Sequence, residues 1–442
     1  MTYSTDAESA LTAVKHRPAT AGAVPAPADP TLPGGSTVFE QPRQPRRRRL
    51  AAVAAALAVG VSAVVTAIPT TGAEAAVTAD TIPLTIANHS GRGEHVYVYN
   101  IGTLLSTGQQ GWADANGTFH PWPGGGSPPV DAPDASIAGP ADGASLTIRM
   151  PKFSGRVYFS YGRKLVFRLA TGGLVQPAVQ SPTDPNADIL FNWTEYTLND
   201  DGLWINSTQV DMFSAPYSVG LTRADGTTLS TGRLKPGGYQ AFFAALRGLP
   251  GGWAGLIRTR ADGTVLRAVA PGHGIEAGDL PRTLLDDYVN RVWARYRGQT
   301  LTVAPFAQSP EIEYYGRVTG DVMTFTNAAG QVVTTFGRPD SDSILGCYKQ
   351  LDAPNDLVRG PISRTLCAGY NRGTLLSSAD QPYTEAGGFY ADAVTNEYAR
   401  LVHAQMVDGR AYAFAFDDVG AHESLVHDGA PAQASITLDA LD

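Results

Sequence analysis

Apolar and polar residues alternate along a series of short runs that begins near residue 82. The runs cover residues 82–88, 95–101, 145–149, 155–159 and 165–169. Successive side chains of a β-strand point to opposite faces, so this alternation predicts strands with one buried face and one exposed face. Several short strands at this spacing indicate a sandwich or barrel. Residues 119–143 are dense in Pro, Gly, Asp and Ala, which predicts a long surface loop.

The pattern changes after Pro216, where helical periodicity appears among further strand-like runs. Helices are predicted at 237–248, 283–297, 361–370 and 396–407, and strands at 311–318, 331–336, 411–416 and 434–438. In the clearest helix, Thr283 with Asp286 predicts the N-terminal cap and Gly298 the end. We therefore expect a mainly β protein, with a β-barrel or sandwich domain formed by residues 76–215 and 408–442. A mixed α/β domain is expected to be inserted at about 216–407.

The first 75 residues have the pattern of a disordered leader followed by a signal peptide. Four arginines at 46–49 precede an apolar run from Leu50 to Ile68, and Ala73-Glu74-Ala75 forms a small-x-small cleavage signal. The run is nearly long enough to anchor the chain in a membrane, but alanine is weakly hydrophobic and the cleavage signal follows directly. We expect a secreted protein with no membrane attachment after cleavage. The general and twin-arginine export routes both remain open.

The net charge and the cysteine content indicate which partners and which compartment suit the protein. The formal net charge is −8 at pH 7, which argues against nucleic acid or an anionic membrane as the partner, because both require a positive field. A neutral polymer requires none. Two cysteines, Cys347 and Cys367, suggest one disulfide in an oxidising compartment, and two buried thiols are the alternative. Such a bridge closes a loop of about 20 residues and contributes roughly 3 kcal/mol in the chain-entropy model.

The most informative segment, residues 188–213, predicts a hairpin with its turn at 199–202. It carries two carboxylates, Glu195 and Asp211, among Trp, Thr and Asn side chains. Hydrolysis of a sugar polymer requires two such acids, one to protonate the leaving oxygen and one to activate water or attack the sugar. The same spacing also fits a solvated hairpin with two ordinary surface acids. The pattern alone leaves both interpretations open.

Strand parity predicts which side chains of this hairpin share a face. A turn centred between Asp201 and Gly202 would pair Glu195 with Thr208. One face would then carry the residues Glu195, Thr197, Asn199, Trp204, Asn206 and Thr208. Asp211 has the wrong parity, so either the strand bulges before it or it lies past the end of the strand. A bulge would leave room for a water molecule, with the carboxyl groups roughly 6.5–9.5 Å apart, which predicts inversion at the anomeric carbon.

Other candidate motifs fail, and we expect no metal or organic cofactor. The run from Asp184 to Glu195 imitates a calcium loop, but Ile189 stands where the sharp turn needs Gly. No zinc helix, nucleophile elbow or P-loop is found. Lys164 fits a solvated strand-end lysine better than a sugar ligand. Asp417 and Asp418 fit turn or strand-end positions and become sugar-contact candidates only if they face a groove.

Thr194–Asn199 and Gln209–Phe213 resemble the hairpin of thaumatin-like proteins and, more closely, that of glycoside hydrolase family 64, the endo-β-1,3-glucanases that release laminaripentaose. The resemblance runs from about Ile82 to the C-terminus and includes the segments 155–167, 343–347, 360–367 and 413–419. It implies a thaumatin-like β domain, the inserted domain and a wide groove between them. It also implies that Glu195 is the general acid, that Asp211 is the general base, and that sugar contacts come from Thr197, Asn199, Trp204 and Thr208. Simple β propensity is the alternative for the two threonines, and core packing for Trp204.

Together these observations predict a secreted, monomeric, inverting endo-β-1,3-glucanase that acts on polymers such as laminarin or curdlan and releases short oligosaccharides such as laminaripentaose. The alternative is a thaumatin-like module that binds β-1,3-glucan without cleaving it. A cell-surface structural protein, which would neither bind nor cleave glucan, is a third possibility.

Overall fold

The computed structural model describes residues 80–442 of the chain. The predicted leader, its apolar run and its cleavage signal therefore lie outside the described residues. Within residues 80–442, no helix is long and apolar enough to cross a membrane.

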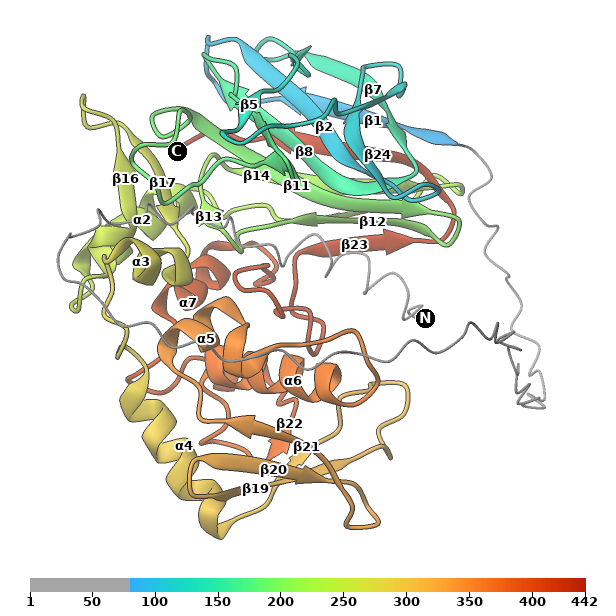
Figure 1. The fold of residues 1–442 in the computed structure, drawn as a ribbon. Helices are drawn as coiled ribbons and strands as arrows, with labels where there is room; N and C mark the ends of the chain where they lie inside the picture. Colours follow the sequence, from blue (N-terminus) through green and yellow to red (C-terminus); the bar gives the residue numbers. More distant parts are fainter. Residues whose placement is uncertain (1–79) are drawn as a thin grey trace, which may run out of the picture. The chain divides into compact units, whose positions relative to one another are not determined.

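Two large β-sheets form the first part of the fold (Figure 1). The first has five strands in the order β15-β14-β24-β1-β7. The second has the order β23-β12-β11-β8-β2-β3-β4, and β6 pairs with β2 beside this path. The bounds in the first sheet are β1 Thr81–Asn88, β7 Ser145–Pro151, β14 Tyr217–Arg223, β15 Thr228–Thr231 and β24 Pro431–Leu438. Those in the second are β2 Val96–Leu104, β3 Gln109–Ala113, β4 Phe119–Pro121, β6 Ile137–Ala138, β8 Phe153–Tyr161, β11 Leu190–Asn199, β12 Gly202–Ser207 and β23 Leu425–Asp428.

The alternating residues of these strands build one apolar core between the two sheets. The five-stranded sheet contributes Leu84 and Ile436, among others, and the larger sheet contributes Val157, Leu198 and Ile205. Each is at most 1 % exposed. Burying an aliphatic side chain of this size stabilises the fold by about 1.5–3 kcal/mol. One face of the larger sheet is thus committed to the core, and the residues of opposite parity form its other face.

Both ends of the described chain meet in the five-stranded sheet, because β1 pairs in parallel with β24. The strands β14 and β15 also belong to this sheet. The sheet therefore includes residues after 215, the position at which we expected the first segment of the β domain to end. Residues 80–442 all fall within one compact unit, and the division into two domains stays a prediction.

Smaller sheets and helices complete the described part of the chain. Two three-stranded sheets contain β5 Val130–Asp131, β9 Arg168–Ala170 and β10 Gly173–Val175, and β13 Met212–Phe213, β16 Ile257–Thr259 and β17 Val265–Val269. A second five-stranded sheet contains β18 Leu301–Val303, β19 Tyr314–Thr319, β20 Val322–Thr326, β21 Val332–Gly337 and β22 Asp380–Gln381. The helices are α2 Gly238–Gly248, α3 Pro271–Ala277, α4 Asp286–Gly298, α5 Ser341–Gly346, α6 Arg359–Arg372 and α7 Glu397–Gln405, and the 3-10 turns are η1 Trp253–Leu256, η2 Lys349–Leu351 and η3 Ala386–Gly388.

All four predicted helices are present as α2, α4, α6 and α7, with small differences at their ends. Helix α4 begins at Asp286, and no side chain caps it, so the predicted cap at Thr283 is wrong. The predicted strand at 411–416 is also wrong, because only Tyr412 makes an isolated bridge there, to Thr208. The predicted loop at 119–143 contains the short strands β4, β5 and β6.

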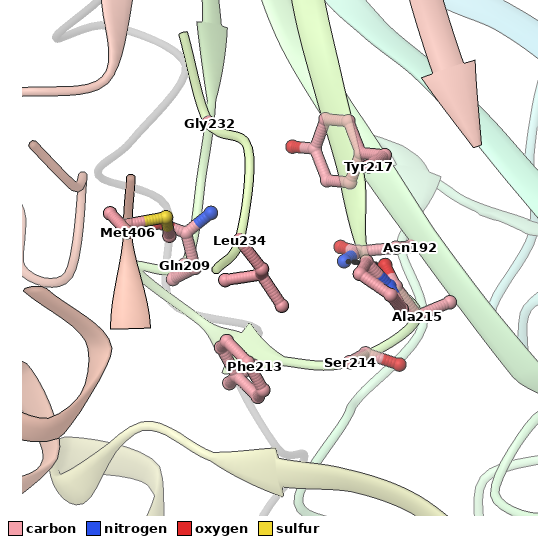
Figure 2. Close-up of a pocket in the computed structure, with 10 residues that line it drawn as sticks. Asn192, Gln209, Phe213, Ser214, Ala215, Tyr217, Gly232, Leu234 and Met406 are labelled. Atoms are coloured by element: carbon pink, nitrogen blue, oxygen red, sulfur yellow. Dashed lines mark hydrogen bonds between the residues drawn. The ribbon is translucent and has the colours of Figure 1, made fainter. Parts of the chain in front are cut away.

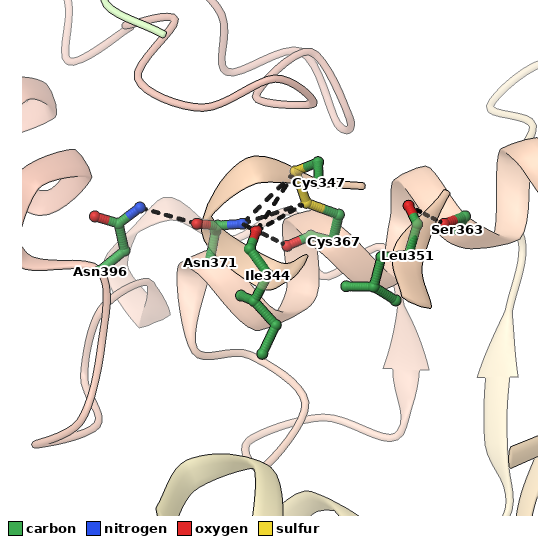
Figure 3. Close-up of a disulfide and its surroundings, with 7 residues drawn as sticks. All are labelled: Ile344, Cys347, Leu351, Ser363, Cys367, Asn371 and Asn396. Carbon is green, nitrogen blue, oxygen red and sulfur yellow. Dashed lines mark hydrogen bonds between the residues drawn. A yellow bond between two sulfur atoms is a disulfide. The ribbon is translucent and has the colours of Figure 1, made fainter. Parts of the chain in front are cut away.

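The predicted disulfide joins Cys347 and Cys367, with their Cα atoms 5.7 Å apart (Figure 3). It ties the end of α5 to the middle of α6. Beside it, the side-chain amide of Asn371 donates hydrogen bonds to the carbonyl oxygens of Ile344, at 2.8 Å, and of Cys367, at 3.1 Å. Covalent and polar links thus fix the same helix pair.

Candidate active site

The hairpin formed by β11 and β12 turns through only two residues, Asp200 and Asp201. Asn199 therefore pairs with Gly202, and Glu195 pairs with Asn206. The predicted register is wrong by two residues, because the turn is centred between the two aspartates. Gly202 has φ +130°, and a Cβ there would lie 2.2 Å from the carbonyl oxygen of Asp428. Glycine thus serves as the first residue of the returning strand, where the sequence pattern placed it inside the turn.

A shift of two residues leaves the parity of the strands unchanged. Tyr196, Leu198, Leu203 and Ile205 face the core between the sheets. Glu195 and Thr197 therefore lie on the opposite face, with their partners Asn206 and Trp204. Asn199 also has this parity, and its Oδ1 accepts a hydrogen bond from the backbone N–H of Asp201 at 2.9 Å, so its side chain stabilises the turn.

Thr208 and Asp211 follow the end of β12 at Ser207. Of the two alternatives for Asp211, the position past the strand end is therefore the observed one. The backbone N–H of Ala270 donates a hydrogen bond to the carbonyl of Asp211 at 2.9 Å, and β13 pairs with β17 immediately afterwards. The segment that carries Asp211 is thus fixed to residues more than fifty positions further along the chain.

Arg156 brings the two carboxylates together. It stands opposite Glu195 in the β8–β11 ladder. Its Nη2 lies 3.0 Å from Glu195 Oε1 and 3.4 Å from Asp211 Oδ2, and its Nε lies 3.2 Å from Glu195 Oε1. The guanidinium also lies over the ring of Trp193, 4.7 Å from its centroid. Sequence reasoning missed Arg156, although its parity in β8 is opposite to that of the core residue Val157.

His273 of α3 contacts Asp211 from another direction. Its Nε2 lies 3.1 Å from Asp211 Oδ1, and its Nδ1 lies 3.1 Å from Glu276 Oε2. Burial would lower the pKa of His273, but its hydrogen bonds to both carboxylates raise it to about 9. Burial would raise the pKa of Asp211, but the hydrogen bond to His273 and the charge of Arg156 outweigh that effect and lower it. Asp211 is therefore an ionised carboxylate at neutral pH.

Glu195 is the more enclosed of the two acids. Its side chain is 4 % exposed, against 28 % for Asp211. Asn206 Nδ2 donates a hydrogen bond to Glu195 Oε2 at 3.4 Å. A sheltered carboxyl group beside a more open, ionised carboxylate is an arrangement that supports general acid and general base catalysis.

Trp204 belongs to neither of the two large apolar cores of the described chain. It packs only with Leu425 among apolar side chains, although it is 3 % exposed. Its ring stacks on that of His427, with the centroids 3.9 Å apart. Trp204 is thus buried in a small cluster of its own, and a sugar contact and core packing both stay predictions for it.

Two further residues that we considered as sugar contacts, Lys164 and Asp417, form ion pairs with other side chains of the protein. Lys164 pairs with Asp134 at 2.5 Å and is half exposed, as expected for a solvated lysine. Asp417 is fully buried and pairs with Arg372 at 2.9 Å and with His403 at 2.8 Å. It is therefore no candidate for a sugar contact.

A small cavity is lined in part by residues that precede and follow Asp211 in the sequence (Figure 2). Gln209, Phe213, Tyr217, Leu234 and Met406 are among its lining residues, and neither catalytic candidate lines it. It has room for about one water molecule. Within residues 80–442, no group of three or more His, Cys, Asp or Glu side chains could hold a metal ion.

Comparison with known proteins gives consistent matches across the described chain. The family model for β-1,3-glucanases of glycoside hydrolase family 64 matches residues 80–438. Glucan endo-1,3-beta-glucosidases of Cellulosimicrobium cellulans and of Arthrobacter sp. (strain YCWD3) are each 57 % identical over 387 residues, which cover 87 % of this chain and 70 % of the relative.

Two solved structures are also similar. The crystal structure of a laminaripentaose-producing β-1,3-glucanase in complex with laminaritetraose has 67 % sequence identity and a TM-score of 0.81, and the match covers 82 % of this chain and 100 % of that one. A β-1,3-glucanase domain of the same family from Clostridium beijerinckii has 25 % identity and a TM-score of 0.69, over 81 % and 98 % of the two chains.

Proposed function

The chain belongs to glycoside hydrolase family 64, the β-1,3-glucanases, and from this premise we propose that Glu195 and Asp211 hydrolyse internal linkages of β-1,3-glucan with inversion. The observation that carries the proposal is the shared arginine. Arg156 Nη2 lies within 3.4 Å of an oxygen of each carboxylate, although the two acids come from different segments. Two acids held by one guanidinium meet the basic requirement for hydrolysis of a glycosidic bond.

Each acid has the surroundings that its role requires. Glu195 is enclosed, and as the general acid it donates a proton to the glycosidic oxygen as the bond breaks. Asp211 is more open and has a lowered pKa, so it is ionised and accepts a proton from the attacking water. That water becomes the new hydroxyl at the anomeric carbon, and the departing chain keeps the proton from Glu195. No cofactor takes part in this scheme.

Inversion requires that the water attack from the face opposite the leaving group. Asp211 supports this assignment because it lies beyond the strand end, away from the row of side chains that contains Glu195. The two oxygens that face Arg156 can be no further apart than the sum of their distances to its Nη2. That upper limit, about 6.4 Å, lies just below the roughly 6.5–9.5 Å between carboxyl groups typical of inverting enzymes, so the stereochemistry is assigned by product analysis and not by this distance.

We expect the glucan to lie across the sheet face that carries Glu195. The expected sugar contacts are Thr197 and Trp204, which pair on this face, Asn199 at the turn, and Thr208 just past the end of β12. Thr197, Trp204 and Thr208 are at most 3 % exposed, and Asn199 is the more accessible of the four. Neutral sugars are bound by such combinations of hydrogen-bonding groups and apolar ring faces. The finer expectations also belong to this proposal: a thaumatin-like β domain with an inserted α/β domain and a wide groove between them, export from the cell, and a monomeric state.

The test is product analysis on laminarin and curdlan with wild type, Glu195→Gln and Asp211→Asn. We expect oligosaccharides from wild type, and a loss of turnover in both variants of at least about 100-fold, typical for a general acid or base. Asp201→Asn is the matched control, because Asp201 lies in the turn of the same hairpin and is exposed, so its turnover should equal that of wild type.

Two outcomes would contradict the proposal. Retention of glucan in a pull-down without release of sugar by wild type would leave a binding module as the function. Turnover in Asp211→Asn equal to wild type would remove Asp211 from the mechanism. Proton NMR of the first-formed product decides the stereochemistry, since inversion of a β-linkage gives the α-anomer first.

A further inference from the structure

The segment that follows β17 holds Asp211 at both its backbone and its side chain. Met212 pairs with Val269, and the N–H of Ala270 donates to the carbonyl of Asp211 at 2.9 Å. His273, in the first turn of α3, then reaches back to the carboxylate. One short stretch of chain thus fixes where the backbone of Asp211 lies and where its side chain points.

The hydrogen-bond geometry determines the charge of the His273 ring. Both ring nitrogens face carboxylate oxygens, Nε2 that of Asp211 and Nδ1 that of Glu276, each at 3.1 Å. Ionised carboxylates only accept hydrogen bonds, so both nitrogens must carry a proton for both contacts to be hydrogen bonds. The ring is therefore an imidazolium, which agrees with its pKa of about 9.

On the basis of the proposed function, in which Asp211 is the general base, we infer that His273 is its positioning residue. The imidazolium holds Asp211 Oδ1, and Arg156 contacts Oδ2, so the plane of the carboxylate is fixed relative to Glu195. Glu276 in turn orients the ring, and Gln180 Nε2 lies 3.3 Å from the same Glu276 oxygen. Such a chain of charged partners preserves the ionised form and the direction of a catalytic group.

Other charged or titratable groups near this pair do not replace His273. Arg156 lies on the far side of Asp211 and also contacts Glu195. The Tyr398 phenol of α7 is near Asp211, but it donates to the Gln209 carbonyl at 2.6 Å, and burial raises its pKa well above the usual value. It is therefore neutral and cannot supply positive charge. The contact with Oδ1 comes from His273 Nε2.

The inference predicts a specific kinetic signature for His273→Ala. Loss of orientation should lower kcat by about 10- to 100-fold, with KM changed by less than about threefold, because the substrate is bound by other residues. Loss of the positive charge should also move the acid limb of the pH profile to higher pH, since Asp211 would then protonate more readily. His273→Gln, which keeps a donor but not the charge, should recover part of kcat and keep the shifted acid limb.

A matched control and a direct titration separate this role from a structural one. His95→Asn, at an exposed histidine just before β2, should retain the wild-type kcat and profile. Proton–nitrogen NMR of the wild-type ring should show His273 titrating near its pKa of about 9, and the value should fall in Asp211→Asn. Glu276→Gln should lower it as well, which gives a second test if His273→Ala does not fold.

The outcomes distinguish this inference from the proposed function. If Asp211→Asn is inactive but His273→Ala keeps the wild-type kcat and acid limb, the role of His273 is refuted and the catalytic pair stands. A wild-type ring that titrates near the ordinary value of about 6.5 also refutes it. If Asp211→Asn retains full turnover, the proposed function itself fails.

Discussion

Replacement of Arg156 by methionine should move the acid limb of activity by an amount that the structure lets us work out. The guanidinium lies 3.0 Å from Glu195 and 3.4 Å from Asp211, and the three side chains are only 12 %, 4 % and 28 % exposed. An opposite charge at such a distance typically lowers the pKa of a carboxyl group by about 1–3, which corresponds to about 1.4–4 kcal/mol. Because Asp211 keeps His273 as a second positive partner, we expect its pKa to rise by an amount near the lower end, about 1–2.

The sign follows from the charge that is removed. Without Arg156, the ionised form of Asp211 is less stable, its pKa rises, and the acid limb of kcat/KM moves to higher pH. At a pH below that limb, the ionised fraction falls about tenfold each time the pKa of Asp211 rises by one, so activity on the acid side should fall by about 10- to 100-fold. Methionine can retain the apolar contact with Trp193, above which the guanidinium lies.

The assay is the pH dependence of kcat/KM, measured by release of reducing sugar from a soluble laminari-oligosaccharide. Arg156→Lys is the matched control, because it keeps the charge but loses the fork that contacts both acids, and it should move the limb less than methionine does. An Arg156→Met profile that superimposes on wild type would refute the reasoning, since it would mean that the arginine exerts no field on Asp211.

Three further predictions concern stability. Replacing Cys347 and Cys367 by serine should lower the free energy of unfolding by roughly 3 kcal/mol, measured by urea denaturation, and reductant should destabilise only the wild type. Burial raises the pKa of Glu423 from its ordinary value of 4.5 to about 8. The free energy of unfolding therefore decreases as the pH rises from the pKa of the unfolded state to that of the folded state. Glu423→Gln should accordingly be more thermally stable than wild type in alkaline buffer but not in acidic buffer. Arg372→Met leaves buried Asp417 without its arginine and should cost about 3–5 kcal/mol in the same urea assay, and a loss below about 1 kcal/mol would contradict it.

The sequence pattern was sufficient to predict which hairpin side chains share a face with Glu195. Side chains alternate with a period of two along a strand, so a register error of two residues leaves each of them on the same face. The pattern also predicted the two cysteines as a pair, and the helices with a continuous apolar side. The exact turn was missed because Asp-Asp-Gly allows more than one two-residue loop, and the position of Gly202 is decided by the close approach of Asp428.

The partners of the two acids could not be predicted from local pattern. Arg156 and His273 lie 39 and 62 positions from the carboxylates they contact. Only strand order places the first beside Glu195, and only the pairing of β13 with β17 brings the second to Asp211. A charged residue within an alternating strand, as Arg156 is before Val157, is the sequence signal from which the first partner could have been found. No comparable pattern in the sequence around His273 indicates its contact with Asp211.

The parallel pairing of β1 with β24 has a consequence for how this protein is made. The middle strand of the sheet β15-β14-β24-β1-β7 is β24, the last strand of residues 80–442, and both of its neighbours, β1 and β14, are synthesised long before it. Until residues 431–438 arrive, those neighbours expose unpaired backbone edges and cannot close the layer. Assembly of the sheet must therefore wait until residues 431–438 have been synthesised, so a molecule that lacks them should leave this sheet open to proteases.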